Sequence, residues 1–121
     1  MKNSLCFVVS CLALFLMVAC NYAKPVMYVD IVNNSGHAIQ NLEVQHPTDR
    51  GPGQFGLPAL RSEQRHQHMI PIGTPCHFRV QFDDESGKHY AQEFDLGQQC
   101  PTQVVFELDA GMKVSERTGT R

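Results

Sequence analysis

The sequence predicts an all-β fold, an antiparallel β-sandwich of about seven strands. Three observations lead to this prediction. Short segments rich in β-branched and aromatic residues recur after residue 25, turn residues separate them, and none has the 3.6-residue period of an amphipathic helix. The chain has 121 residues, which is the length of one domain.

Composition excludes several classes of protein. The 10 Lys and Arg residues against 12 Asp and Glu residues give a net charge of −2, so the chain has no basic field for nucleic acid. A chain of this length is too short for a TIM barrel or a two-domain enzyme. We therefore expect a small single domain that does not bind nucleic acid.

The N-terminal segment predicts export. Fifteen of the nineteen residues at positions 1–19 are apolar, and Lys2 is their only charge. A positive start followed by about 15 apolar residues is typical of a secretory signal peptide and is too short for a membrane-spanning helix. We therefore predict a helical signal peptide over residues 1–19.

The end of this signal, Met17-Val18-Ala19-Cys20, resembles the lipobox of bacterial lipoproteins, in which the cysteine thiol receives diacylglycerol. The resemblance implies lipidation of Cys20, palmitate-type acyl chains in the membrane and a domain that faces the periplasm. Asn21 stands where an Asp favours retention at the inner membrane, so it favours the outer membrane. The alternative is cleavage after Ala23, which leaves a soluble secreted or periplasmic protein.

The cysteines agree with export. Two of the five lie within the signal, and Cys20 is the expected lipid site. The remaining pair, Cys76 and Cys100, predicts one disulfide in an exported domain, and its spacing is too long for a CxxC motif. Such a bridge stabilises a small domain by roughly 3 kcal/mol in the chain-entropy model.

The predicted domain covers residues 26–115, between a short tether at 20–25 and a flexible tail at 116–121. We expect strands at residues 26–32, 38–45, 63–72, 76–82, 90–96, 103–108 and 112–115. Strands of this number and length are typical of an immunoglobulin-like sandwich, although the Cys…Trp…Cys core of antibody domains is absent.

Three segments depart from a regular strand pattern. Asn41 breaks the alternation of the second strand and predicts a β-bulge. Two Pro and two Gly predict an exposed loop at residues 46–54, and residues 55–60 indicate an irregular cover over the core. The loop is a candidate recognition loop, because binding residues concentrate in loops on rigid scaffolds.

The clearest strand is residues 76–82, in which apolar and polar residues alternate. Its outward side chains, which are candidates to line a binding face, are His77, Arg79 and Gln81. If Phe82 and His89 flank the following turn, paired residue numbers sum to about 171. Cys76 then lies opposite residue 95, close to Cys100, so the predicted disulfide is geometrically plausible.

Four sequence stretches follow one another over residues 28–114: VDIVNNSGHAIQNLEV, FGLPAL, FRVQFDDESGKHY and VVFELDAGMKV. Their order resembles a loose group of small exported or lipid-anchored bacterial β-sandwich proteins, in which the first strand ends in Val-Asn-Asn-Ser-Gly. The group is largely uncharacterised. The resemblance therefore implies the fold and no catalytic residue.

Six histidines raise a metal-binding alternative. On a strand, His66 and His68 share one face about 6.5–7 Å apart, and imidazole suits copper or zinc. Further ligands are uncertain, with His46 and Met27 as guesses, while Met69 points to the opposite face. The other interpretation of residues 63–72 is a polar strand that faces solvent.

The sequence does not predict an enzyme or a cofactor. It has no GxSxG, no HExxH and no Gly-rich phosphate loop after a strand. The acidic residues 83–85 indicate a charged hairpin tip. We therefore expect a non-catalytic cell-envelope lipoprotein that binds a protein partner, as an accessory subunit, inhibitor or immunity protein does. The alternative is a periplasmic copper- or zinc-binding protein that uses His66 and His68.

Overall fold

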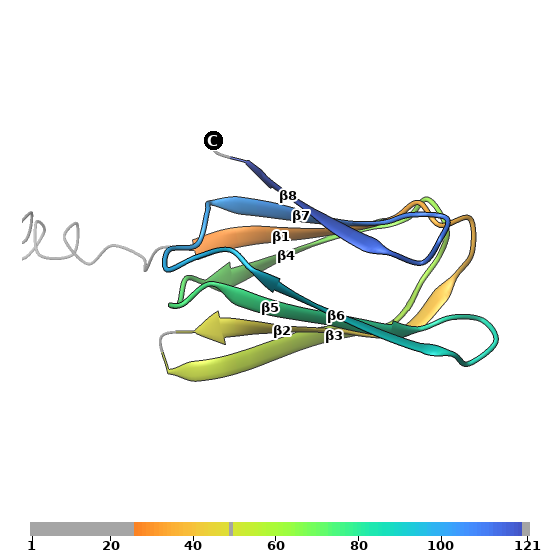
Figure 1. The fold of residues 1–121 in the computed structure, drawn as a ribbon, viewed down its shortest axis with the longest axis horizontal. Helices are drawn as coiled ribbons and strands as arrows, with labels where there is room; N and C mark the ends of the chain where they lie inside the picture. The colour runs from red at the N-terminus through yellow and green to blue at the C-terminus, as the bar shows by residue number, and fades with distance from the viewer. Residues whose placement is uncertain (1–25, 49, 120–121) are drawn as a thin grey trace, which may run out of the picture.

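A computed structural model describes residues 26–48 and 50–119, which form eight strands in two four-stranded sheets (Figure 1). The strands are β1 (Val26–Asn33), β2 (Ile39–Thr48), β3 (Gly51–Leu60), β4 (Arg65–Pro71), β5 (His77–Asp83), β6 (His89–Asp95), β7 (Gln103–Leu108) and β8 (Val114–Gly119). The all-β fold is confirmed, with one strand more than expected. The predicted signal peptide, lipobox and tether lie outside the described residues, and no helix within those residues is long and apolar enough to cross a membrane.

The strands form two layers. Sheet A has the order β4-β1-β7-β8, and sheet B has the order β3-β2-β5-β6. The pairing of β1 with β7 is parallel, whereas the other pairings are antiparallel. The expectation of a purely antiparallel sandwich is therefore wrong at this pair, because both strands enter sheet A from the same end (Figure 1).

The core lies between the two sheets and is built by alternation along each strand. Phe78, Val80 and Phe82 of β5 are at most 2% exposed, as the sequence pattern predicts. Phe106 of β7 is 1% exposed, and its ring centroid lies 5.4 Å from that of Phe78 and 4.9 Å from that of Phe94. The two inner faces therefore interdigitate through aromatic contacts.

The predicted bulge is confirmed, and the predicted hairpin of β5 and β6 is present with its register shifted by one residue. Asn41 has a positive φ of 53°, and the pairing of β2 with β5 shifts between Gln40 and Glu43, so a bulge is present there. In the hairpin of β5 and β6, Phe82 pairs with Tyr90. Paired residue numbers therefore sum to 172, one more than the expected value of about 171.

The expected loop at residues 46–54 and the irregular cover at 55–60 are wrong. Residues 46–48 complete β2, and residues 51–60 form β3, which pairs with β2 as far as Thr48 and Gly51. An edge strand tolerates its prolines because half of its N–H groups face away from the neighbouring strand. The segment is therefore a β-hairpin with a short turn.

The flexible tail expected from residue 116 is also partly wrong, because β8 continues to Gly119. The strand pairs with β7 from Val114 opposite Leu108 to Gly119 opposite Gln103. Backbone hydrogen bonds to β7 therefore hold residues 116–119 in a strand, although their polar sequence does not predict one.

Candidate functional site

A groove with a volume of about 1000 Å³ lies at one end of the sandwich, on the outer side of sheet B. Three segments line it: the hairpin of β2 and β3, the loop between β4 and β5, and the outer face of β5 and β6. The lining residues are Gln45, His46, Pro47, Thr48, Gly51, Pro52, Ile72, Gly73, Thr74, Pro75, His77, Arg79, Gln81 and Glu93.

The hairpin and the β4–β5 loop touch at the side of the groove. Gly73 of the loop is buried against the backbone of Thr48, where an added Cβ would lie only 2.6 Å from the Thr48 nitrogen. A side chain at position 73 would therefore push the loop away from the hairpin. The segment predicted as a recognition loop does line the groove, although as a hairpin.

Charged side chains form the sheet side of the groove. His77, Arg79 and Gln81 lie on the outer face of β5, as the sequence pattern predicts. The Glu93 carboxylate on β6 lies 2.9 Å from His77 Nε2 and accepts a hydrogen bond of 3.1 Å from Arg79 Nη1. These groups are between 37% and 55% exposed, so their ion pairs contribute at most about 1 kcal/mol and leave the surface open to a ligand.

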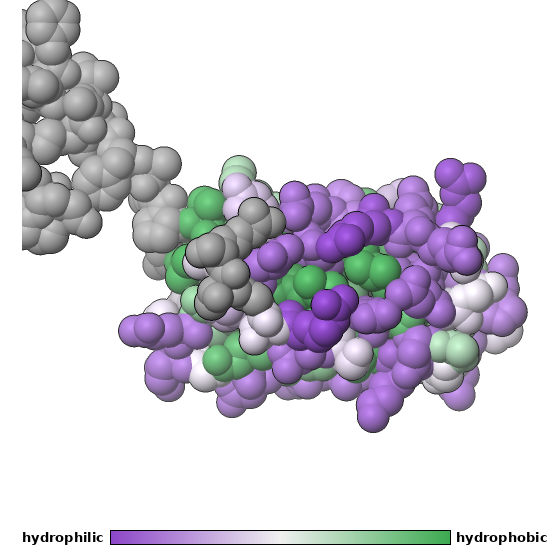
Figure 2. All heavy atoms as spheres, turned by 90° about the horizontal axis from the view of Figure 1, so that it is seen from above, coloured by the Kyte–Doolittle hydropathy of each residue, from purple (hydrophilic) through white to green (hydrophobic). Residues whose placement is uncertain are grey.

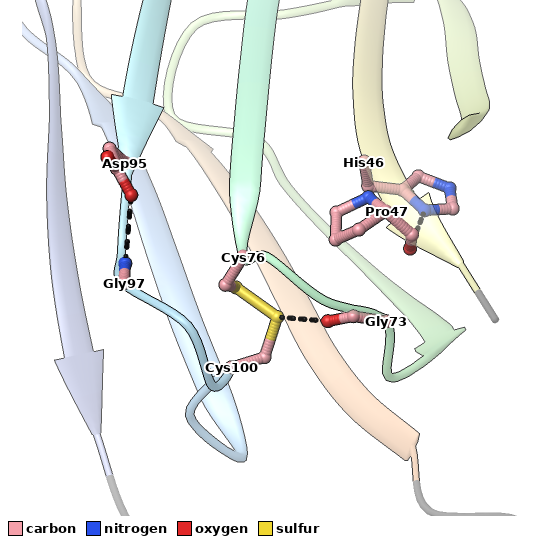
Figure 3. The surroundings of a disulfide bond; sticks show 7 residues. All are labelled: His46, Pro47, Gly73, Cys76, Asp95, Gly97 and Cys100. Carbon is pink, nitrogen blue, oxygen red and sulfur yellow. Dashed lines mark hydrogen bonds between the residues drawn. A yellow bond between two sulfur atoms is a disulfide. The ribbon is translucent and has the colours of Figure 1, made fainter. Parts of the chain in front are cut away.

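The predicted disulfide is present at the same end of the molecule (Figure 3). The sulfur atoms of Cys76 and Cys100 are 2.11 Å apart, and the Cα atoms are 5.0 Å apart. Cys76 N–H donates a hydrogen bond of 2.7 Å to Gly97 O, and Cys100 Sγ lies 3.5 Å from Gly73 O. The bridge therefore holds the β6–β7 connection against the loop that lines the groove.

Behind the hairpin, four rings fill the open edge between β3 and β4, and we name this cluster the imidazole seam: His46, Phe55, His66 and His68. The Phe55 ring stacks on His68 with centroids 4.1 Å apart, and lies 5.9 Å from His46 and 6.3 Å from His66. The rings of His66 and His68 are 5.9 Å apart. The seam joins the two sheets through ring contacts.

The interpretation of residues 63–72 as a solvent-facing strand is wrong for His66 and His68. They pair with Ile31 and Val29, which are core residues, and paired residues share a face of the sheet. Both imidazoles therefore lie half-buried between the sheets. Met69 points the opposite way, as expected, and is 57% exposed.

The seam does not have the geometry of a metal site. Within residues 26–48 and 50–119, no group of three His, Cys, Asp or Glu side chains is arranged to hold an ion. The planes of His66 and His68 are 29° apart and stacked, so their in-plane nitrogen lone pairs do not converge. The guessed ligand Met27 is fully buried and pairs with Ile70, while His46 Nδ1 lies 3.0 Å from Pro47 O.

The outer face of sheet A is mainly hydrophilic, with a small hydrophobic centre (Figure 2). Asp30 is 1% exposed there and accepts hydrogen bonds of 2.7 Å from Arg65, 2.9 Å from Gln67 and 3.0 Å from Gln103. Burial raises the pKa of Asp30, but these hydrogen bonds and the Arg65 charge outweigh it, so that the pKa lies below its ordinary value of 3.8. The network is a structural tie between β1, β4 and β7.

Comparisons with known proteins support the fold alone. No family model matches the chain, and no curated protein matches it. A solved structure described as the NMR structure of the protein from Eubacterium rectale is similar to it, with a TM-score of 0.56 and 18% identity over 81% of this chain and 92% of that chain. At this identity the similarity supports the arrangement of strands alone.

Proposed function

We propose that this protein is a non-catalytic lipoprotein of the bacterial cell envelope, attached to the outer membrane through Cys20, that binds a protein partner through the groove. One observation carries the proposal. The groove is lined by the β4–β5 loop, which directly follows Pro71, and Pro71 pairs with Val26 at the start of the described chain. The groove therefore lies at the end of the sandwich where β1 begins and β4 ends, and Figure 1 shows these two strand ends side by side.

The tether limits how far this end lies from the anchor. Residues 20–25 span at most about 20 Å when fully extended, at about 3.3–3.6 Å a residue. A lipid on Cys20 would therefore hold the groove close to the bilayer surface. A partner that is itself in or on the membrane would meet the groove without a search through the periplasm.

The lining of the groove supports a polypeptide ligand. Its volume is at the upper limit of the roughly 300–1,000 Å³ of small-molecule pockets. Apolar contacts from Pro47, Pro52 and Ile72 lie beside the hydrogen-bonding groups of Arg79 and Glu93. Apolar centres with polar groups at their borders are typical of protein interfaces. The disulfide and the hairpin hold this surface in place, which lowers the entropic cost of binding.

Site-specific photocrosslinking in living cells tests the proposal. A benzoylphenylalanine at Arg79 is expected to form a discrete adduct with one envelope protein, whereas the same probe at Ser115, exposed on β8 of the other sheet, is not. Gly73→Ala should weaken the adduct, because its Cβ displaces the loop from Thr48. The Cys20→Ser variant should weaken it too, by releasing the groove from the membrane.

Three outcomes contradict the proposal. They are equal adducts from Arg79 and Ser115, no adduct from either position, and an Arg79 adduct that is unchanged by Cys20→Ser. Metabolic labelling with a clickable palmitate analogue tests the anchor separately. It should mark the wild-type protein and not the Cys20→Ser variant, whereas failure to label either would favour cleavage after Ala23.

A further inference from the structure

The imidazole seam and the groove share the β2–β3 hairpin. His46 lines the groove, and its ring also packs against Phe55 inside the sandwich edge. Gly53 of β3 leaves room for this ring, because an added Cβ there would lie 3.0 Å from His46 Cε1. A change in the packing of the seam would therefore move a wall of the groove.

Among the described residues, the side chains that pair with or stack on the seam are uncharged apart from its own histidines. From β1 the facing side chains are Val29 and Ile31, and from β3 the facing ring is Phe55. Arg65 and Gln67 of β4 point to the other face, where they bind Asp30. Among the described residues, no Asp or Glu forms an ion pair with these three imidazoles, whereas each of the other three histidines has a carboxylate within 3.1 Å.

We propose that the seam is an acid-sensitive latch: protonation of His68, whose ring stacks on Phe55, loosens the β2–β3 hairpin from β4 and thereby opens the wall of the groove. A neutral His68 imidazole stacks on Phe55 without penalty, whereas a positive charge on it in this half-buried site is poorly solvated and has no partner carboxylate among the described residues. The effect on partner binding rests on the proposed function of the groove. The latch itself does not.

The direction of the pH effect follows from His68. Burial lowers the pKa of His68 below its ordinary value of 6.5, and the charges of His66 and His46 lower it further. The unfolded chain therefore binds the proton more tightly than the folded one. The contribution of neutral His68 to the free energy of unfolding is therefore present above its ordinary pKa of 6.5 and is lost as the pH falls below that value.

Urea unfolding of the purified, disulfide-intact protein at pH 7.5 and pH 5.0 tests the latch. We expect the wild-type midpoint to fall at pH 5.0, and the fall to shrink in the double variant His66→Gln/His68→Gln. The matched control is His37→Gln/His89→Gln, whose histidines are exposed and lie beside Glu85 and Asp83. The control should keep the wild-type fall or increase it.

An equal fall in the seam variant and the wild type would overturn the latch. If the double variant does not fold, NMR titration of the wild-type imidazole signals decides instead, because a His68 signal that titrates at or above pH 6.5 overturns it as well. Neither measurement uses a partner. Failure of the latch would therefore leave the groove proposal standing, and failure of the crosslinking would leave the latch.

Discussion

The two open edges of the sandwich are filled by rings of different chemistry. At the edge between β3 and β4, three imidazoles surround Phe55. On the side of β6, which is the other edge strand of sheet B, Tyr90 stacks on Phe82 of β5 with centroids 5.2 Å apart, and Phe94 packs on the core residue Phe106 of β7. Both edges exclude water with flat side chains, but only the imidazoles change charge near neutral pH.

This difference divides the molecule into two parts by the pH dependence of their packing. We call β5, β6 and β7, which carry the phenyl rings, the fixed half, and the β2–β3 hairpin with β4, which carry the imidazoles, the conditional half. The phenyl edge depends on apolar burial, which is insensitive to moderate acid. The imidazole edge depends on a neutral His68, whose pKa burial lowers. The hairpin at the imidazole edge also lines the groove, so a change at this edge would reach the candidate binding site.

The largest effect is expected from truncation of the fixed half. Phe106→Ala removes a ring that is 1% exposed and contacts both Phe78 and Phe94, so it should destabilise the protein by about 3–5 kcal/mol. The loss should be the same at pH 7.5 and 5.0 by urea unfolding. Phe106→Leu is the milder variant if the first does not fold, and a loss confined to pH 5.0 would contradict the comparison.

Removal of the disulfide should lower the free energy of unfolding of the whole domain by the same amount at pH 7.5 and pH 5.0. The Cys76→Ala/Cys100→Ala variant reopens a loop with a sequence separation of 24, which corresponds to about 3 kcal/mol in the chain-entropy model. Guanidinium unfolding with and without reductant measures this loss. It should again be equal at both pH values, and reductant should have no further effect on the variant.

Asp30→Asn tests a second source of acid sensitivity, on the outer face of sheet A. The variant loses the charge-assisted hydrogen bond from Arg65, so we expect a loss of about 1–3 kcal/mol at pH 7.5. Because the pKa of Asp30 lies below 3.8 in the folded protein, its contribution is present above pH 3.8 and is lost as the pH falls below it. Thermal melting at pH 3 and pH 7.5 should show this loss in the wild type and not in the variant.

His68→Phe converts part of the imidazole edge into a phenyl edge. At pH 7.5 we expect a change of less than about 1 kcal/mol, because the ring size is nearly kept. At pH 5.0 the variant should melt above the wild type, since position 68 can no longer be protonated. A variant that melts below the wild type at both pH values would show that His68 makes a polar contribution in the folded state.

Much of the fixed half could be predicted from the sequence. Alternation in β5 predicts its buried face, because the signal is local. The bulge at Asn41 has a local signal too, although it lies on β2 of the hairpin in the conditional half. The conditional half could not be predicted in the same way. His66 and His68 alternate with polar residues and indicate a solvated strand, but their pairing with β1 turns them toward the core.

The hairpin was missed for a similar reason. Pro47 and Pro52 face each other in the β2–β3 ladder. An edge strand permits prolines at such positions, whereas a segment rich in Pro and Gly is by composition predicted to be a loop. The same limit applies to the groove. Glu93 joins His77 and Arg79 only through the register of β5 with β6, although the outward face of β5 was already visible in the sequence.

Hydrogen exchange across both edges in one sample tests the central comparison most directly. After correction for intrinsic rates, lowering the pH from 7.5 to 5.0 should raise exchange several-fold in the amides of residues 43–57 and leave those of β5 and β7 nearly unchanged. Equal changes in both halves, or protection of residues 43–57 that does not depend on pH, would contradict the account.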